Sequence, residues 1–221
     1  MNTLSSIPQA AQSLAREGVA FAPQIARAAA KYGLDPRLLA AVAAQETGGP
    51  GSNAGRNILG DGGHGHGIFQ IDDRFHAFAQ SAQAMNPQAN ADYAAGMIAG
   101  LLKQYGGNPS RPSGQALHEA LSAYNAGDPN ATGTKTDWQD GRRLGYADSV
   151  LRHYAALAGT TPQTLTQTLS AESRDEQSSV NALSSFAALQ PPAPPQITHH
   201  PWKAQSADFG SIVFDGDDSS E

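Results

Sequence analysis

Glu46 places a titratable side chain at the end of an apolar helical run that starts at Leu38. The same helical face carries the residues three, four and seven positions before it, Ala43, Val42 and Leu39. A carboxylate on a face that enters the core loses its hydration, and burial favours its protonated form. Cleavage of a glycosidic bond requires such a protonated acid near neutral pH. Considered alone, Glu46 fits a solvated residue near a helix C-terminus better, so the acid assignment depends on the segments that follow.

Two later segments give the chain a family resemblance. Residues 60–74 read GDGGHGHGIFQIDDR, and residues 120–127 read ALSAYNAG. Glu-Thr after an apolar helix, a glycine-rich turn ending in two hydrophobic residues and Gln, and Ala-Tyr-Asn-Ala-Gly form the pattern of the lysozyme-like lytic transglycosylases. The chain resembles this group over roughly residues 22–157. The Gly-Asp before the glycine run and the Gln-Ile-Asp-Asp-Arg after it are more similar to goose-type lysozymes. Three ordered motifs at compatible spacing make the resemblance specific.

The resemblance implies a mostly α, lysozyme-like α+β domain with a small β-hairpin at the active-site cleft. It also implies a muramidase that cuts the β-1,4 bond between N-acetylmuramic acid and N-acetylglucosamine in peptidoglycan glycan strands. The expected route is goose-type hydrolysis. Lytic transglycosylation, in which the muramoyl 6-hydroxyl replaces water, is an alternative that needs one acid only. A non-catalytic virion or wall-binding protein on the same scaffold is a further alternative, because a fold alone does not give a function.

Asp61 and Asp72 flank the glycine-rich segment and would face Glu46 across a cleft if that segment folds back on itself. In goose-type lysozymes the acids at the matching positions hold the hydrolytic water, and the resemblance implies this role for both. Asp61 in Gly-Asp-Gly is otherwise a common turn former. Asp72 or Asp73 is otherwise a helix N-cap before residues 75–78, and capping is the main role expected for Asp73.

The segment from Gly65 to Gln70 resembles the family segment that binds substrate next to the acid. A saccharide along a strand needs a backbone without Cβ atoms in its way, which would explain the glycines. By resemblance, the substrate-binding residues include Gly67, Ile68, Phe69 and Gln70. Phe69 fits the core equally well, and Gln70 is expected to bond backbone or sugar.

Three residues of later helices complete the expected site. Tyr124 and Asn125 match the family's Tyr-Asn, in which the tyrosine packs beside the acid and the asparagine contacts substrate. Helix capping and core packing explain this pair about equally well. Tyr146, in Gly-Tyr-Ala-Asp, matches another family tyrosine near the acid, through a shorter motif.

Neither a metal nor a cofactor is expected. His64 and His66 lie two residues apart in the glycine-rich loop, but no cysteine or third histidine lies nearby, so zinc is not favoured. The two histidines are expected at the rim of the cleft.

Composition separates a neutral region from an acidic tail. Residues 1–158 carry twelve acidic and twelve basic side chains, whereas residues 159–221 carry eight acidic and two basic ones. A neutral catalytic region does not favour binding to nucleic acid, which requires a basic stripe.

The absence of cysteine excludes disulfides. No stretch approaches a membrane span, and the N-terminus lacks the basic and apolar regions of a secretory signal. Phage-mediated release, virion delivery and specialised secretion all fit an enzyme that acts on the wall.

The sequence predicts an N-terminal extension (1–21), a catalytic domain (22–158) and a largely disordered, proline-rich acidic tail (159–221), whose apolar residues 209–214 could dock a protein partner. Helices are expected at residues 5–18, 23–32, from Asp35-Pro36 to Glu46, along the i+4 series Tyr93 to Tyr105, from Ser113, and at 144–157. Seven glycines predict a loop over residues 51–67, followed by a short strand or hairpin arm at 67–72.

Overall fold

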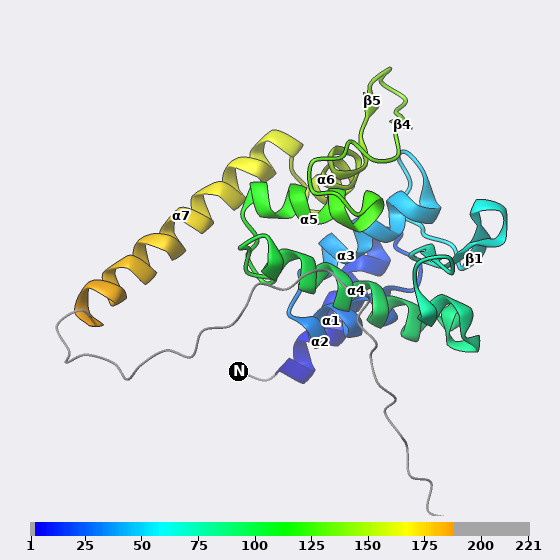
Figure 1. Ribbon diagram of the computed structural model, residues 1–221, viewed down its shortest axis with the longest axis horizontal. Coiled ribbons are helices and arrows are strands. Elements are labelled where there is room, and N and C mark those ends of the chain that lie inside the picture. Colours follow the sequence, from blue (N-terminus) through cyan, green and yellow to red (C-terminus); the bar gives the residue numbers. More distant parts are fainter. Residues whose placement is uncertain (1–2, 188–221) are drawn as a thin grey trace, which may run out of the picture. The chain divides into compact units, whose positions relative to one another are not determined.

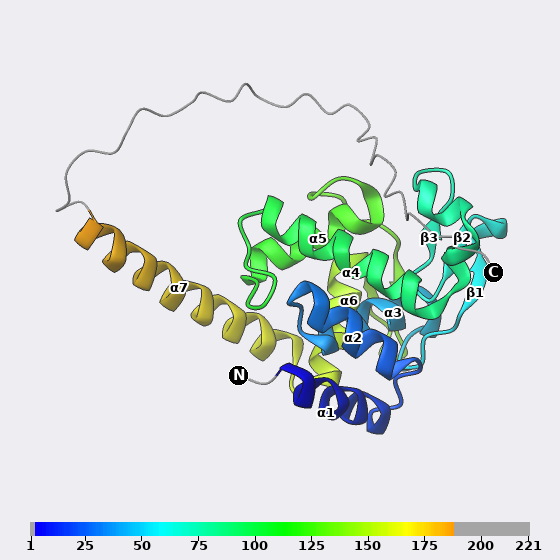
Figure 2. The ribbon, with the colours of Figure 1, turned by 90° about the horizontal axis from the view of Figure 1, so that it is seen from below.

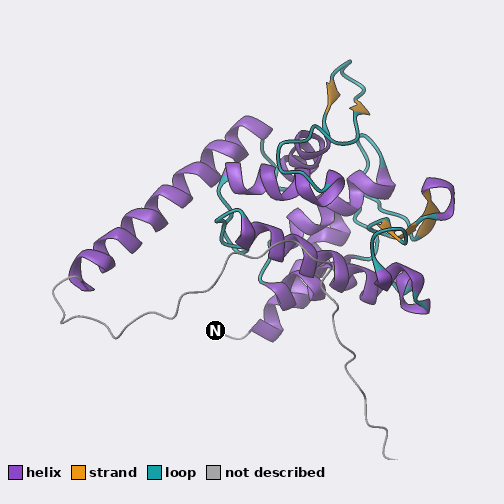
Figure 3. Ribbon diagram, viewed as in Figure 1, coloured by secondary structure: helices purple, strands orange, loops and turns teal. Residues whose placement is uncertain are grey.

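The computed structural model describes residues 3–187, and residues 1, 2 and 188–221 lie outside the described part. The chain divides into one compact unit of residues 1–182 and a second of residues 183–221, of which only the end of a helix is described. Helices make up most of the described chain, with a few short strands (Figure 3). The expected mostly α, lysozyme-like fold with a small β excursion is confirmed.

The described α-helices are α1 (Thr3–Arg16), α2 (Ala22–Tyr32), α3 (Pro36–Ala43), α4 (Pro87–Gln104), α5 (Gly114–Ala126), α6 (Tyr146–Leu157) and α7 (Pro162–Ala187) (Figure 1). A π turn at Ala44–Gly48 continues α3, and 3₁₀ turns lie at Asp61–Gly63, Ala77–Gln80 and Ala82–Met85. The strands are β1 (Ile58–Gly60), β2 (Gly65–Gly67), β3 (Ile71–Asp72), β4 (Thr136–Asp137) and β5 (Arg143–Leu144).

Side-chain caps start several of these helices, as the sequence predicts at two of them. Asp35 accepts a bond from the backbone N–H of Arg37 (2.8 Å), and Pro36 takes the first helical position of α3. Ser113 caps α5 through the backbone N–H of Ala116 (3.1 Å). Both predicted starts are confirmed.

Helix α3 forms the centre of the core. All its residues from Leu38 to Ala43 are buried, and the helix packs against α2 and α6 (Figures 1 and 2). Alanine fills three of these six positions and lets neighbouring helices approach closely. Because α3 is enclosed on all sides, the turn that continues it begins inside the core.

A three-stranded antiparallel sheet in the order β1-β2-β3 follows the π turn. Ile58 pairs with Gly67, and Gly65 pairs with both Gly60 and Asp72. The expected loop over residues 51–67 is therefore wrong for Ile58–Gly60 and Gly65–Gly67, which form strands joined by a short turn. Its glycines are compatible with strand here because neighbouring strands supply hydrogen bonds that no local pattern reveals. The small β4–β5 hairpin was not predicted either.

Helix α7 corrects the expected disorder after residue 159. Leu165 and Leu169, one helical turn apart, are 7% and 6% exposed and belong to the main core. Gly114 at the start of α5 brings this helix close, since a Cβ there would lie 3.2 Å from Thr166 Cγ2. Two leucines in a polar segment were too sparse a signal to predict this packing. The apolar residues 209–214 and the proline linker lie outside the described residues, and the domain limits stay a prediction.

Leu14 of α1 and Val19 are also buried in the core, so residues 1–21 contribute to it. Among the described residues, we find no helix with both the length and the apolar character that crossing a membrane demands.

Candidate active site

Glu46 lies in the π turn Ala44–Gly48, one residue before Thr47. The wider turn ends with a bond from the Gly49 N–H to the Ala44 carbonyl (2.9 Å). The buried Thr47 hydroxyl bonds the carbonyl of Ile68 (3.1 Å), which ties the turn to the end of β2. The apolar helix and the glycine-rich segment, predicted from separate motifs, therefore meet next to Glu46.

The Glu46 carboxyl is half-buried, and its Oε1 atom accepts a 2.5 Å hydrogen bond from the Tyr146 hydroxyl. Burial raises the pKa of this carboxyl to about 7, because desolvation outweighs the Tyr146 bond, which favours the charged form. This raised pKa is what a general acid near neutral pH requires, and the catalytic role of Glu46 stays a prediction. Tyr146 is 1% exposed, at the start of α6.

Tyr124 completes an aromatic wall beside Glu46. Its ring stacks on that of Tyr146 at a centroid distance of 6.3 Å, and its hydroxyl donates to the Phe69 carbonyl (3.1 Å). The charge of Glu46 contributes to the raised pKa of both tyrosines, so both rings lie close to the carboxyl. Both tyrosines thus lie beside Glu46, and their contact with a substrate stays a prediction.

Replacing Tyr146 with Phe is expected to raise the pKa of Glu46 further, because it removes the hydrogen bond that favours the carboxylate. The general acid acts in its protonated form, so the wild-type rate should fall as pH rises through about 7. In Tyr146→Phe this alkaline limb should move to higher pH. Rates of wall solubilisation between pH 5 and 9 measure the shift, and an unchanged or lower alkaline limb would contradict it.

The polar groups of the segment Gly67–Gln70 form hydrogen bonds mainly with other groups of the protein. Ile68 and Phe69 are buried in the core, and their carbonyls accept bonds from Thr47 and Tyr124, so contact of this segment with a substrate stays a prediction. Buried Asn90 of α4 accepts a bond from the Phe69 N–H (2.9 Å) and donates to the His66 carbonyl (2.9 Å). Gly67 has φ +78°, and a Cβ there would lie 2.5 Å from Asn90.

Gln70 crosses the hairpin and bonds backbone, which is one of its two predicted roles. Its Nε2 donates to the carbonyls of Ile58 (3.1 Å) and Gly67 (2.8 Å). A Cβ on Gly65 would lie 2.6 Å from its Oε1 atom, and one on Gly60 closer still. The expectation that these glycines clear space for a saccharide is therefore revised, since the Gln70 and Asn90 side chains fill that space.

Asp61 and Asp72 are brought together by a residue that the sequence did not single out, Arg74. The guanidinium bonds Asp72 through Nε (2.9 Å) and Nη2 (2.5 Å), and Nη2 also bonds Asp61. This pairing holds the pKa of Asp72 low, at about 2. Asp61 and Asp72 lie at the end of the sheet where Gly65 pairs with Asp72. The bond between Thr47, the neighbour of Glu46, and the Ile68 carbonyl lies past the opposite end of β2.

Asp73 does not cap a helix, contrary to the sequence prediction. Its carboxylate bonds His64 Nδ1 (2.8 Å) and His66 Nε2 (3.2 Å), and the next 3₁₀ turn begins after His76. The two histidines thus share one carboxylate. No cluster of three or more His, Cys, Asp and Glu side chains suited to a metal ion occurs in the part of the chain that the structure describes.

Asn125 anchors the loop that precedes α6. Its Oδ1 accepts a bond from the Thr134 N–H (2.8 Å), and a Cβ on Gly133 would lie 2.4 Å from it. This is a structural role, and contact with substrate stays a prediction. In the same region Gln45, the neighbour of Glu46, bonds the Thr136 hydroxyl on β4 (2.8 Å).

Sequence reasoning missed Asn90 and Arg74. Asn90 left a signal, since it is a polar residue in line with the apolar positions of α4. Arg74 left a weaker one, the two-residue spacing from Asp72.

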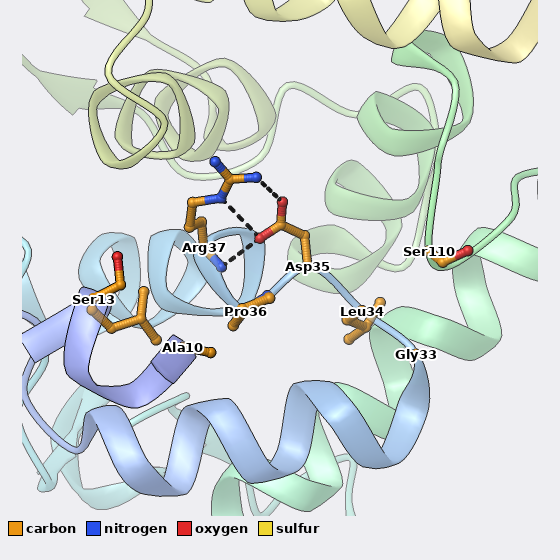
Figure 4. Close-up of a pocket in the computed structure, with 9 residues that line it drawn as sticks. Ala10, Ser13, Gly33, Leu34, Asp35, Pro36, Arg37 and Ser110 are labelled. Carbon is orange, nitrogen blue, oxygen red and sulfur yellow. Dashed lines mark hydrogen bonds and ion pairs between the residues drawn. The ribbon is translucent and has the colours of Figure 1, made fainter. Parts of the chain in front are cut away.

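One pocket of about 410 Å³ lies elsewhere, where α1 meets the start of α3, and Figure 4 shows the Asp35–Arg37 ion pair in its wall. None of the predicted site residues lines it.

Comparison with protein families gives one match, between residues 23–142 and the transglycosylase SLT domain. No curated protein and no solved structure matches the chain. The match extends over more than half of the 221 residues and includes Glu46, Asp61, Asp72 and Tyr124, whereas Tyr146 follows it. The chain therefore belongs to the transglycosylase SLT family of peptidoglycan-cleaving enzymes.

Proposed function

We propose that the chain cleaves the β-1,4 bond between N-acetylmuramic acid and N-acetylglucosamine, with Glu46 as general acid. The observation that carries the proposal is the Glu46 carboxyl, whose pKa burial raises to about 7 and which Tyr146 orients through a 2.5 Å bond. Such a group is still substantially protonated at neutral pH, as the leaving oxygen requires. A non-catalytic wall-binding role would leave this arrangement without a purpose.

In the first step, Glu46 gives its proton to the bridging oxygen while the bond from that oxygen to C1 of the muramoyl ring breaks. Positive charge develops on the ring as negative charge develops on Glu46. The Tyr146 hydroxyl stabilises the new carboxylate through its hydrogen bond.

For the second step we infer hydrolysis of the goose type. A water molecule attacks C1, the Asp61 and Asp72 carboxylates orient it, and one of the two carboxylates accepts the proton that it loses. Two features support this role: one arginine bonds both carboxylates, and both residues lie on the hairpin whose opposite end contacts the Glu46 turn. Opposite charge from Arg74 keeps Asp72 ionised across the working range of pH.

Lytic transglycosylation is the second candidate, and the surroundings of Glu46 favour it. Desolvation raises the pKa of Glu46 and the Tyr146 bond lowers it, with no contribution from the charge of Asp61 or Asp72 among the described groups. In this route the muramoyl 6-hydroxyl attacks C1, and its proton passes to the Glu46 carboxylate. The product is a 1,6-anhydro end, and no second carboxylate is required.

Mass spectrometry of the fragments released from purified peptidoglycan separates the two routes. Hydrolysis gives reducing ends that are heavier than the anhydro ends by one water molecule. We expect reducing ends to dominate from the first minutes of digestion. Anhydro ends as the main early product would overturn the hydrolytic proposal, and the absence of either product would overturn cleavage itself.

The sequence-based hypotheses on delivery belong to the same proposal. Phage-mediated release, virion delivery and specialised secretion each bring an enzyme to the wall, and residues 191–221 are proposed to dock a protein partner during that step.

A further inference from the structure

The chain contains three Asp-X-Arg segments, at residues 35–37, 72–74 and 140–142. In each, the arginine's backbone N–H donates to the aspartate two residues earlier, at 2.8, 2.8 and 3.3 Å. In each, the arginine Nε also bonds that carboxylate, and Figure 4 shows the pairing for residues 35–37. The pairing of Arg74 with Asp72 is thus a local turn motif that this chain also uses away from the site.

Arg74 differs from the other two arginines by reaching a second carboxylate. Its Nη2 bonds Asp61, thirteen residues earlier in the chain, as well as Asp72. Arg37 and Arg142 each pair with the aspartate of their own turn. The fork of a guanidinium allows this arrangement, because its donors point in fixed directions toward separate acceptors.

The two carboxylates come from opposite edges of the sheet. Asp61 follows β1 and has φ +47°, a left-handed conformation that aspartate tolerates, and Asp72 ends β3. Between these edges lies Gly65 of β2, which pairs with Gly60 and with Asp72. Asp73 bonds the two histidines instead, so within the described chain Arg74 is the side chain that bonds the Asp61 carboxylate.

We infer that Arg74 is a positioning residue that holds Asp61 and Asp72 as one fixed carboxylate pair for the attacking water. The inference rests on the proposed hydrolysis. Without the guanidinium, two like charges at short range repel each other, and the exposed Asp61 side chain is free to leave the pair. Exposed ion pairs contribute little to folding, so the effect falls on the reaction rather than on stability.

The test compares Arg74→Gln and Arg74→Lys with Arg142→Gln as the matched control, since Arg142 occupies the same local motif and bonds Asp140, which is not a candidate site residue. Arg74→Gln should lower the rate of hydrolysis by roughly 10- to 100-fold, the size of effect of a misplaced reacting group. It should also raise the share of anhydro ends. Arg74→Lys should restore part of the rate, and Arg142→Gln should stay within about twofold of wild type.

The double variant Asp61→Asn/Asp72→Asn tests whether Arg74 acts through the two aspartates. In that background Arg74→Gln should have no further effect, because the pair that it positions is gone. Wild-type hydrolysis by Arg74→Gln, together with a slow double-aspartate variant, would overturn the role of Arg74 alone. Full hydrolysis by the double-aspartate variant would instead overturn the proposed hydrolytic route. If Arg74→Gln lowers Tm, the rate of hydrolysis by Arg74→Lys separates a loss of stability from a loss of positioning. A folded Arg74→Lys variant that hydrolyses no faster than Arg74→Gln would overturn the positioning role.

Discussion

Replacing Glu46 with Gln is expected to reduce wall cleavage by about 10²- to 10⁴-fold, the usual contribution of a general acid. The amide has nearly the same shape and can still accept the Tyr146 bond, but it cannot donate an acidic proton. Glutamine is neutral, like the protonated glutamic acid, so the buried turn gains no charge. The release of soluble fragments from purified peptidoglycan measures the loss, and Tm should be unchanged or raised.

Glu17→Gln is the matched control, because it makes the same chemical change at an exposed residue outside the candidate site. It should retain wild-type activity. A Glu46→Gln variant that is folded and nearly as active as wild type would remove Glu46 from the mechanism.

The double variant Asp61→Asn/Asp72→Asn is expected to lose most hydrolytic activity, by roughly 10²-fold, because neither amide can accept a proton from water. Each single variant should lose less, since the remaining carboxylate still orients the water. The pairing with Arg74 makes the two effects interdependent, so the double loss should differ from the product of the single losses.

Counting reducing and anhydro ends in the same digests checks this prediction. The corresponding change at an exposed hairpin residue, Asp137→Asn, should alter neither the rate nor the products. A double-aspartate variant with full activity and anhydro products would show that the 6-hydroxyl, rather than water, completes the reaction.

Much of the helical scaffold could be predicted, because its signals are local. Asp35-Pro36 and Ser113 specify helix starts through bonds to residues two or three positions away. The apolar face that ends in Glu46 likewise predicts a desolvated carboxyl, and the raised pKa follows from that desolvation. The order of the three motifs also indicated the resemblance to the lysozyme-like lytic transglycosylases.

The parts that failed depend on contacts between distant segments. The glycines of β1 and β2 predict a loop until Gln70 and Asn90 are placed against them. Helix α7 joins the core through two leucines that no local pattern distinguishes from the polar residues around them. Arg74 gains its importance from Asp61, thirteen residues away, and no periodicity connects the two.

The protonation of Glu46 can be followed directly by NMR, by titrating its carboxyl carbon in the full chain labelled with ¹³C-glutamate. The Glu46→Gln variant assigns the signal. We expect a titration midpoint near pH 7, because burial raises the pKa of this carboxyl from 4.5 to about 7, and the alkaline limb of the cleavage rate should fall at the same pH. A midpoint near 4.5 would mean that Glu46 is ionised at neutral pH, and it would contradict its role as the acid that breaks the glycosidic bond.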